Sequence, residues 1–179
     1  GQLAVVRQMN YVIDDLMGDA FRTRTSHTGT KGSRHTSLTG NGDRTQTPLI
    51  VILENLQDPG NLGTIVRTAE AAGATGILMS KGCADIYNPK VIRSTMGSIF
   101  RVPFCTTDDL PGAIRKLQKL GVRIHAAHLK GSESLYTQTL TGPCSFLIGN
   151  ESRGLSDEIA ALADSAVRIP MSGKVESLN

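Results

Sequence analysis

The chain has 179 residues, of which 39% are hydrophobic and 20% charged, and it contains no Trp. Its length suits one domain with a short attachment, and its composition excludes fibrous and wholly disordered proteins. The net charge of +3 permits contact with a polyanion without requiring it, no apolar run approaches the roughly 20 residues of a membrane span, and residues 1–7 lack the features of a secretion signal. We therefore expect a cytoplasmic protein.

Two segments precede the main body of the chain. Residues 1–21 predict only a short strand, Leu3–Val6, and a marginal helix, Tyr11–Phe21, which are too little to close a core by themselves. Residues 22–47 contain eight Thr, four Gly and five Arg or Lys against one acid, Asp43. Such a composition predicts a flexible basic linker that is able to contact phosphates.

From Pro48 onward, short apolar runs alternate with helical stretches, which is typical of β–α–β units. The predicted strands are Leu49–Leu53, Thr75–Ser80, Arg101–Cys105, Val122–Ala127, Ser145–Ile148 and Ala166–Ile169. The predicted helices are Leu62–Ala72, Pro89–Met96, Asp109–Leu120 and Ser156–Ala163. This order indicates the α/β class, with a mainly parallel sheet and helices on both of its faces.

Three loops rich in Gly and polar residues follow predicted strands, where open α/β sheets bind their ligands. The first, residues 54–63, leads into the helix that carries Arg67. Its Pro59-Gly60 pair marks a tight turn, after which Asn61 is able to cap the helix. Alone, this loop is equally consistent with an ordinary strand-to-helix turn that exposes an arginine.

The second loop, Gly149–Leu155, places the carboxylate of Glu151 at a strand end, and its two glycines allow a ligand to approach the backbone. A simple helix-capping loop is the alternative. The third loop runs from Ile169 to Asn179. Its Gly-Lys pair is not a phosphate-binding P-loop, because Arg168 stands where the first Gly is needed, and no G-x-G-x-x-G occurs. NTPases and nicotinamide enzymes are therefore not supported.

Together the three loops resemble the motifs of the SpoU (TrmH-like) family of SPOUT RNA 2′-O-ribose methyltransferases, over roughly residues 48–179. The matching residues are Asn61-x-Gly63-x-x-x-Arg67-x-Ala69-x-x-x-Gly73, Gly149-x-Glu151-x-x-Gly154-Leu155-Ser156, and Ile169-Pro170-Met171 through Ser177-Leu178-Asn179. The stretch from Asp85 to Lys90, with Gly97-Ser98, is similar to the members that modify ribosomal RNA. The resemblance therefore favours 23S ribosomal RNA as the substrate.

This resemblance implies a C-terminal trefoil knot and S-adenosylmethionine as the cofactor. The residues that it implies around the cofactor are Ala127, Gly149, Ile169, Met171 and Leu178. The residues that it implies around the substrate ribose are Asn61, Arg67, Glu151, Ser177 and Asn179. It also implies a homodimer, because the family completes its site across two copies.

The resemblance further suggests how the chain is divided. Residues 1–21 are expected to be the remnant of an upstream RNA-binding domain and its connecting helix, and residues 22–47 the linker. Residues 48–179 are expected to be the catalytic domain, whose C-terminal helix is missing after Asn179.

Methyl transfer from a sulfonium requires orientation of the reactants and removal of one hydroxyl proton, so no metal ion is required. The resemblance assigns the base to Arg67, although a guanidinium normally keeps its proton. Two versions stay open. In one, burial makes Arg67 able to accept the proton. In the other, charged Arg67 stabilises the forming alkoxide while a phosphate, a water or Glu151 accepts the proton.

Other functions are also consistent with parts of the sequence: a transfer RNA 2′-O-methyltransferase, a non-catalytic RNA-binding or assembly module with the same fold, and a small-molecule methyltransferase. The five ribose-site residues together disfavour the binding module, and the basic linker favours a polyanionic substrate. An aromatic content of 4%, with no Trp, disfavours a base-stacking single-strand binder. The three cysteines lack C-x-x-C spacing and the four histidines do not cluster, which predicts neither disulfides nor a metal site.

Overall fold

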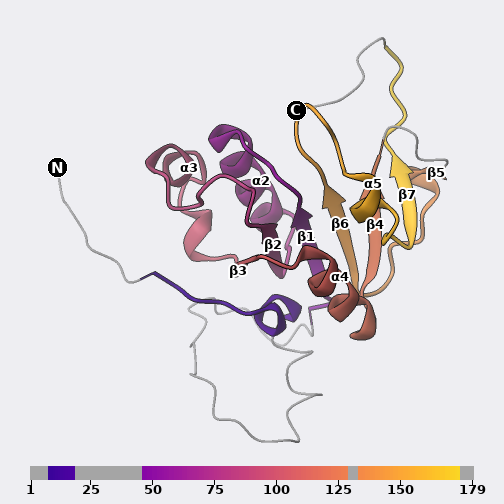
Figure 1. Cartoon of the computed structure of the whole chain (residues 1–179), viewed down its shortest axis with the longest axis horizontal. Coiled ribbons are helices and arrows are strands. Elements are labelled where there is room, and N and C mark those ends of the chain that lie inside the picture. Colours follow the sequence, from indigo (N-terminus) through magenta and orange to yellow (C-terminus); the bar gives the residue numbers. More distant parts are fainter. Residues whose placement is uncertain (1–7, 19–45, 129–132, 174–179) are drawn as a thin grey trace, which may run out of the picture.

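The computed structural model describes residues 8–18, 46–128 and 133–173. These residues form a seven-stranded sheet in the order β3-β2-β1-β6-β4-β7-β5, and all six pairings between neighbours are parallel. The strands are β1 (Leu49–Leu53), β2 (Gly76–Ser80), β3 (Phe104–Thr107), β4 (Arg123–Ala127), β5 (Glu133–Ser134), β6 (Cys144–Ile148) and β7 (Ser165–Arg168). Figure 1 shows the sheet extending from β3 on one side to β5 on the other.

Helices make the crossovers that parallel strands need. The α-helices are α2 (Pro59–Ala71), α3 (Pro89–Ser94), α4 (Leu110–Lys119) and α5 (Asp157–Ala160). Three short 3-10 helices are η1 (Ile13–Met17), η2 (Ser98–Phe100) and η3 (Leu135–Thr137). The predicted α/β class with a parallel sheet is confirmed.

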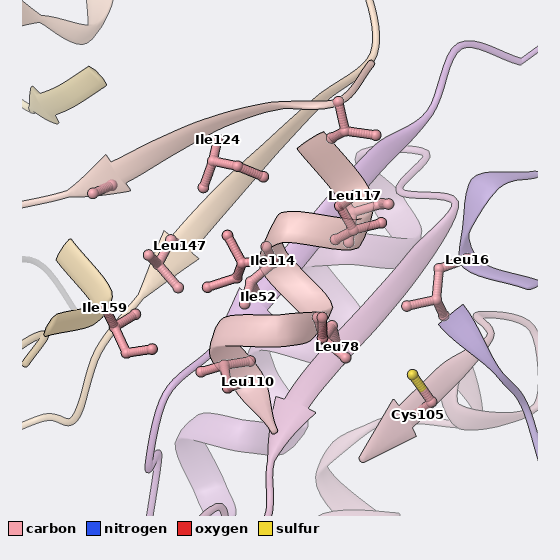
Figure 2. Close-up of a cluster of buried hydrophobic side chains, with 14 of the residues drawn as sticks. Leu16, Ile52, Leu78, Cys105, Leu110, Ile114, Leu117, Ile124, Leu147 and Ile159 are labelled. Carbon is pink, nitrogen blue, oxygen red and sulfur yellow. The ribbon is translucent and has the colours of Figure 1, made fainter. Parts of the chain in front are cut away.

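One face of the sheet packs against α4, α5 and η1. Ile114 and Leu117 of α4 belong to the same buried cluster as Ile52 of β1 and Leu147 of β6, and Figure 2 shows α4 lying over these strands. The buried residues of α4 are Leu110, Ala113, Ile114 and Leu117, which follow the helical repeat and form one apolar stripe. Each large side chain buried in this way contributes about 1.5–3 kcal/mol.

The opposite face packs against α2 and α3. Leu62 and Val66 of α2 cluster with Leu53 of β1 and with Ile77 and Met79 of β2. Neighbouring residues of β1 thus serve different faces, Ile52 one and Leu53 the other, because side chains alternate along a strand. The central strands β1 and β2 are near-continuous apolar runs because helices cover both faces of the sheet, as predicted.

The ends of several elements differ from the prediction. β3 begins at Phe104 rather than Arg101, because Arg101 closes η2 and Pro103 has no N–H to donate to the ladder. α3 ends at Ser94, and α5 stops at Ala160, three residues before the predicted end. α2 begins three residues before the predicted Leu62, at Pro59. β5 and η3 were not predicted.

The N-terminal segment packs against the sheet. Within the described part of the predicted helix Tyr11–Phe21, residues 11–18, the structure has only the 3-10 turn η1, which is followed by Gly18 at φ 75°. Leu16 and Met17 of η1 are completely buried in the cluster beneath α4. Gly76 of β2 makes room for them, since a Cβ at that position would lie 2.7 Å from the side chain of Leu16. Leu16 and Met17 therefore anchor residues 8–18 to the core.

Several expectations lie outside the described residues: the strand Leu3–Val6, the linker up to residue 45, and Ser177, Leu178 and Asn179. The knot depends on this last segment and stays a prediction. No helix among residues 8–18, 46–128 and 133–173 is long and apolar enough to cross a membrane. Cys83, Cys105 and Cys144 are free thiols, and burial raises the pKa of Cys105 to about 11.

Candidate active site

The strand order reverses direction between two neighbouring strands. From β1 the chain moves outward to β2 and β3, whereas from β6 it moves the other way to β7, and β1 and β6 lie side by side. The loops after these two strands diverge to opposite faces of the sheet, towards α2 and α5. Such a reversal leaves a crevice at the carboxyl ends of the strands, where open α/β sheets bind ligands.

The carboxylate of Glu151 joins the two loops at this position. Its Oε1 accepts a hydrogen bond of 2.9 Å from the backbone N–H of Asp58, and its Oε2 accepts one of 3.2 Å from that of Gln57. The amide Nδ2 of Asn61 donates to Oε1 at 3.5 Å. Glu151 therefore links the loop after β6 to the start of α2 and brings together two of the predicted site residues, Glu151 and Asn61.

These contacts set the protonation state of Glu151. Burial acts to raise the pKa of its carboxyl group, but the N–H groups of Asp58, Glu151 itself and Gln57, together with the Asn61 amide, outweigh burial and lower it. A carboxylate with a lowered pKa and both oxygens engaged is a weak proton acceptor. The geometry therefore fits Glu151 as a group that holds Asn61 in place.

Two further residues fix the loop that carries Glu151. The amide of Asn150 donates from Nδ2 to the carbonyl of Asn55 at 2.8 Å, while its Oδ1 accepts from the backbone of Ser152 and Arg153. Backbone bonds between Asn150 and Gly154 close the loop so tightly that a Cβ on Gly149 would overlap the backbone of Gly154. Gly149 is therefore required by the loop itself.

The carboxylate of Glu54 hydrogen-bonds Ser156, which directly follows the same loop. Glu54 is only 6% exposed, and it accepts hydrogen bonds from the hydroxyl of Ser156 at 2.6 Å and from the N–H of Ser156 at 2.8 Å. Ser156 in turn caps α5 through the N–H of Ile159, as predicted. Sequence reasoning missed both Glu54 and Asn150. The available signal was the position of Glu54 directly after a buried strand.

The start of α2 corrects one prediction. Asp58, not Asn61, is the N-cap, because its Oδ1 accepts the N–H of Asn61 at 2.8 Å and Pro59 occupies the first helical position. The Asp-Pro pair is the signal that could have identified this cap. Asn61 is thereby released from capping, and its side chain turns to Glu151.

Arg67 lies on another side of α2. Arg67 follows Asn61 by six positions, which places it about 240° further around the helix axis after one full turn. Arg67 instead shares a stripe with Gly63 and Glu70, where α2 packs on the α3 segment: a Cβ on Gly63 would overlap Ser94, and Glu70 binds Arg101 at 3.0 Å. The side chain of Arg67 is exposed. The described residues of one chain therefore do not bring Arg67 to the Asn61–Glu151 pair.

Four of the five predicted cofactor residues lie at or just beyond the carboxyl ends of neighbouring strands. β4 lies between β6 and β7, with Ala126 opposite Leu147 and Ala127 opposite Val167. This register places Ala127, Gly149 and Ile169 at the carboxyl ends of three adjacent strands, and Met171 follows two residues later. Ile169 is 47% exposed there. Leu178 lies outside the described residues.

Comparison with known proteins agrees with this architecture. Residues 48–179 match the model of the SpoU rRNA Methylase family. The chain belongs to this family. It is 35% identical over 138 residues to the 23S rRNA (guanosine-2′-O-)-methyltransferase RlmB of Pseudomonas putida, covering 76% of this chain and 56% of that protein. It spans about half the length of the curated relatives that it matches.

Solved structures of SpoU proteins share the fold. The AdoMet-bound rRNA methyltransferase of Sinorhizobium meliloti is 40% identical, with a TM-score of 0.70 over 75% of this chain and 52% of that one. The TrmH/SpoU tRNA modifying enzyme of A. aeolicus is 32% identical, with a TM-score of 0.66 over 75% of this chain and 68% of that one. The SpoU fold that the three motifs predicted is thus confirmed.

One cavity of this SpoU chain lies away from these motifs. It has a volume of about 450 Å³ and opens at the ends of β2 and β3, between residues 9–11 and the loop of residues 81–87. None of the seven predicted site residues that the structure describes lines it. Among the described residues, no group of three or more His, Cys, Asp or Glu is arranged to hold a metal ion.

Proposed function

We propose that this protein transfers a methyl group from S-adenosylmethionine to a ribose 2′-hydroxyl of RNA, with 23S ribosomal RNA as the favoured substrate. The observation that carries the proposal is the contact of Glu151 with Asp58, Gln57 and Asn61. It joins the first two family motifs at the point where the strand order reverses. The name of the Pseudomonas putida relative supports both the reaction and the substrate.

We infer that Ala127, Gly149, Ile169 and Met171 line the cofactor site, with Leu178 completing it. The described part fits this ligand, because Ile169 and Ala127 are exposed apolar side chains at adjacent strand ends, where an adenine or thioether would find apolar contact. When bound, S-adenosylmethionine supplies a methyl group already activated on a sulfonium. The S. meliloti structure, described as AdoMet-bound, supports this assignment.

The exposure of Arg67 favours one of the two versions of its role in proton transfer. The described residues of one chain do not bury its guanidinium, so they do not provide the desolvation that a neutral arginine needs. We therefore favour the version in which charged Arg67 stabilises the forming alkoxide by its hydrogen bonds. With S-adenosylmethionine bound, the methyl group would pass from sulfur to the ribose oxygen, the neutral thioether would be the leaving group, and the hydroxyl proton would go to a phosphate or water.

Glu151 acts in this proposal through Asn61. Its oxygens are engaged by N–H donors and its pKa is lowered, so it stays ionised and orients the Asn61 amide toward the crevice. Asn61 then hydrogen-bonds the ribose. Ser177 and Asn179, which lie outside the described residues, keep their expected roles at the ribose.

We also propose that the protein acts as a homodimer. On α2, Asn61 turns towards Glu151 while Arg67 lies on the stripe that faces the α3 segment. A second copy that supplies Arg67 to the Asn61–Glu151 pair would reconcile these two orientations. Because the proposed substrate is a ribosomal RNA like that of the P. putida relative, we also propose a cytoplasmic location.

Transfer RNA is the second candidate substrate. The A. aeolicus tRNA modifying enzyme supports it, since this chain covers 68% of that protein. The two RNAs are distinguished by the same assay as the reaction itself. Unmodified 23S ribosomal RNA and unmodified transfer RNA are each incubated with protein and methyl-labelled S-adenosylmethionine, and the RNA is then digested to nucleosides.

We expect a labelled 2′-O-methyl nucleoside from ribosomal RNA, which disappears with Arg67→Ala while cofactor binding persists. Arg123→Ala is the matched control, because Arg123 is an exposed arginine at the start of β4, at the other end of the strand from Ala127. This variant should methylate RNA normally. Full activity of Arg67→Ala would contradict the role of Arg67. Cofactor and RNA binding without methylation of either RNA would favour a non-catalytic binding module.

A further inference from the structure

Three large apolar side chains are exposed on the segment that packs against α2. They belong to Ile92, Met96 and Phe100, whose side chains are 38%, 71% and 64% exposed. We call these three residues the Phe100 platform. They come from α3, from η2 and from the turn between them. Single exposed apolar residues are common, whereas three large ones within residues 92–100 are typical of a contact surface.

The backbone holds the platform in a fixed shape. On either side of Met96, Thr95 and Ser98 are buried, and their hydroxyls donate to the carbonyl of Ile92 at 2.8 Å and to Glu70 at 3.3 Å. Met96 itself adopts φ 50°, a conformation uncommon outside glycine, and Gly97 follows at φ 87°. The fold thus keeps Met96 turned outward in a strained conformation of the kind that clusters at functional sites.

The segment that carries the platform, residues 89–101, packs on the stripe of α2 that includes Arg67. Gly63, Arg67 and Glu70 form one stripe of α2, and the two flanking residues contact the platform segment, Gly63 at Ser94 and Glu70 at Ser98 and Arg101. Arg67 lies between these two contacts on the same stripe. An RNA nucleotide on the platform would therefore be next to the arginine that we propose acts on the ribose.

The charge around the platform suits a polyanion. Residues 86–107 contain Lys90, Arg93 and Arg101 and no acidic residue. Arg101 is paired with Glu70, whereas Arg67 and Arg93 form no ion pair with any part of the chain that the structure describes. Both are exposed. A symmetric contact centred on the platform itself would bring the Arg93 side chains of two copies together, which disfavours a second copy as the occupant of this surface.

We propose that the Phe100 platform binds an unpaired nucleotide of the substrate RNA, with its base stacked on Phe100 and packed against Met96, and a neighbouring phosphate at Arg93. The inference rests on the proposed function and assigns a base-binding surface to it. An aromatic ring and a thioether offer contact to any base, and arginine pairs with phosphate. The platform would thus position the RNA strand rather than read its sequence.

The test uses Phe100→Ala, with binding to an unmodified 23S ribosomal RNA transcript as the first readout. Loss of one stacked base should weaken binding roughly 5- to 150-fold. KM should rise by a similar factor, while the Kd for S-adenosylmethionine stays unchanged. Phe100→Tyr keeps the ring and should bind as the unsubstituted protein does. Tyr136→Ala removes a ring that is 78% exposed on η3, after β5, and serves as the matched control.

A second variant reports on the phosphate. Arg93→Ala should reduce the slope of log Kd against log salt concentration by about one.

Unchanged RNA binding by Phe100→Ala, in a protein that methylates RNA, would overturn the proposed base-binding role of the platform and leave the proposed function standing. A shift of Phe100→Ala from dimer to monomer would also overturn it, because a second copy would then cover the surface. If the unsubstituted protein bound no RNA, both proposals would fail. Weaker RNA binding by Phe100→Ala supports the platform even if no methyl transfer is seen.

Discussion

At the scale of single residues, the acid stability of the site depends on Glu151. The pKa of its carboxyl group is lowered from the ordinary value of 4.5 by N–H donors at the start of α2. Its stabilising contribution is therefore complete above that value, and is lost as the pH falls below it through the folded-state pKa. Glu151→Gln removes the charge, and should lower the free energy of unfolding at pH 7 by about 1 kcal/mol, since the pair is exposed to solvent.

The measurement is urea unfolding at a series of pH values from neutral to acidic. The difference between Glu151→Gln and the unsubstituted protein should shrink as the pH falls. Glu158→Gln, the same substitution on an exposed acid of α5, is the control for the removal of a surface carboxylate. A constant difference at every pH would mean that the charge of Glu151 does not stabilise the fold.

At the scale of elements, the buried carboxylate of Glu54 links β1 to α5. Ser156→Ala removes both the 2.6 Å hydrogen bond to Glu54 and the cap of α5, and should destabilise the protein by about 2–4 kcal/mol. Ser134→Ala is the matched control, because Ser134 caps η3 at Tyr136 without an acidic partner. Ser134→Ala should lower the free energy of unfolding by less than about 1 kcal/mol. Equal effects in thermal unfolding would show that the Glu54 bond contributes nothing.

Elements were predictable where local patterns decide them. Asp109 caps α4 and the helix covers the predicted stretch, because its apolar repeat and capping residue agree. α5 was predicted too long because Asp164, forty residues from Ile124, exchanges hydrogen bonds with it and draws the chain into β7. The roles of Glu54 and Glu151 likewise depend on partners about a hundred positions away, which no local pattern reveals.

At the scale of the whole molecule, the core extends into the N-terminal segment. Leu16 is completely buried against the sheet, so Leu16→Ala should lower the free energy of unfolding by about 2–5 kcal/mol. Val12 of the same segment is 59% exposed, and Val12→Ala should change stability by less than about 0.5 kcal/mol. Denaturant unfolding compares the two. Similar small effects would mean that residues 8–18 do not stabilise the fold.

The proposed dimer can be tested by mixing two inactive variants. If Arg67 of one copy serves the Asn61–Glu151 pair of the other, Asn61→Ala and Arg67→Ala are each inactive alone but complement each other in mixed pairs. Every mixed pair then has one intact site, and random exchange of subunits should restore about a quarter of the unsubstituted activity. Methyl transfer to RNA is measured after the two variants are mixed and allowed to exchange.

Arg67→Ala mixed with Arg67→Ala,Asn61→Ala is the control, and it should stay inactive because neither copy supplies the arginine. Persistent inactivity of the complementing mixture, with exchange verified by differently tagged copies, would place Asn61 and Arg67 in the same copy. In that case α2 must rearrange when RNA binds, because their positions about 240° apart around the helix do not meet at one ribose in the described conformation.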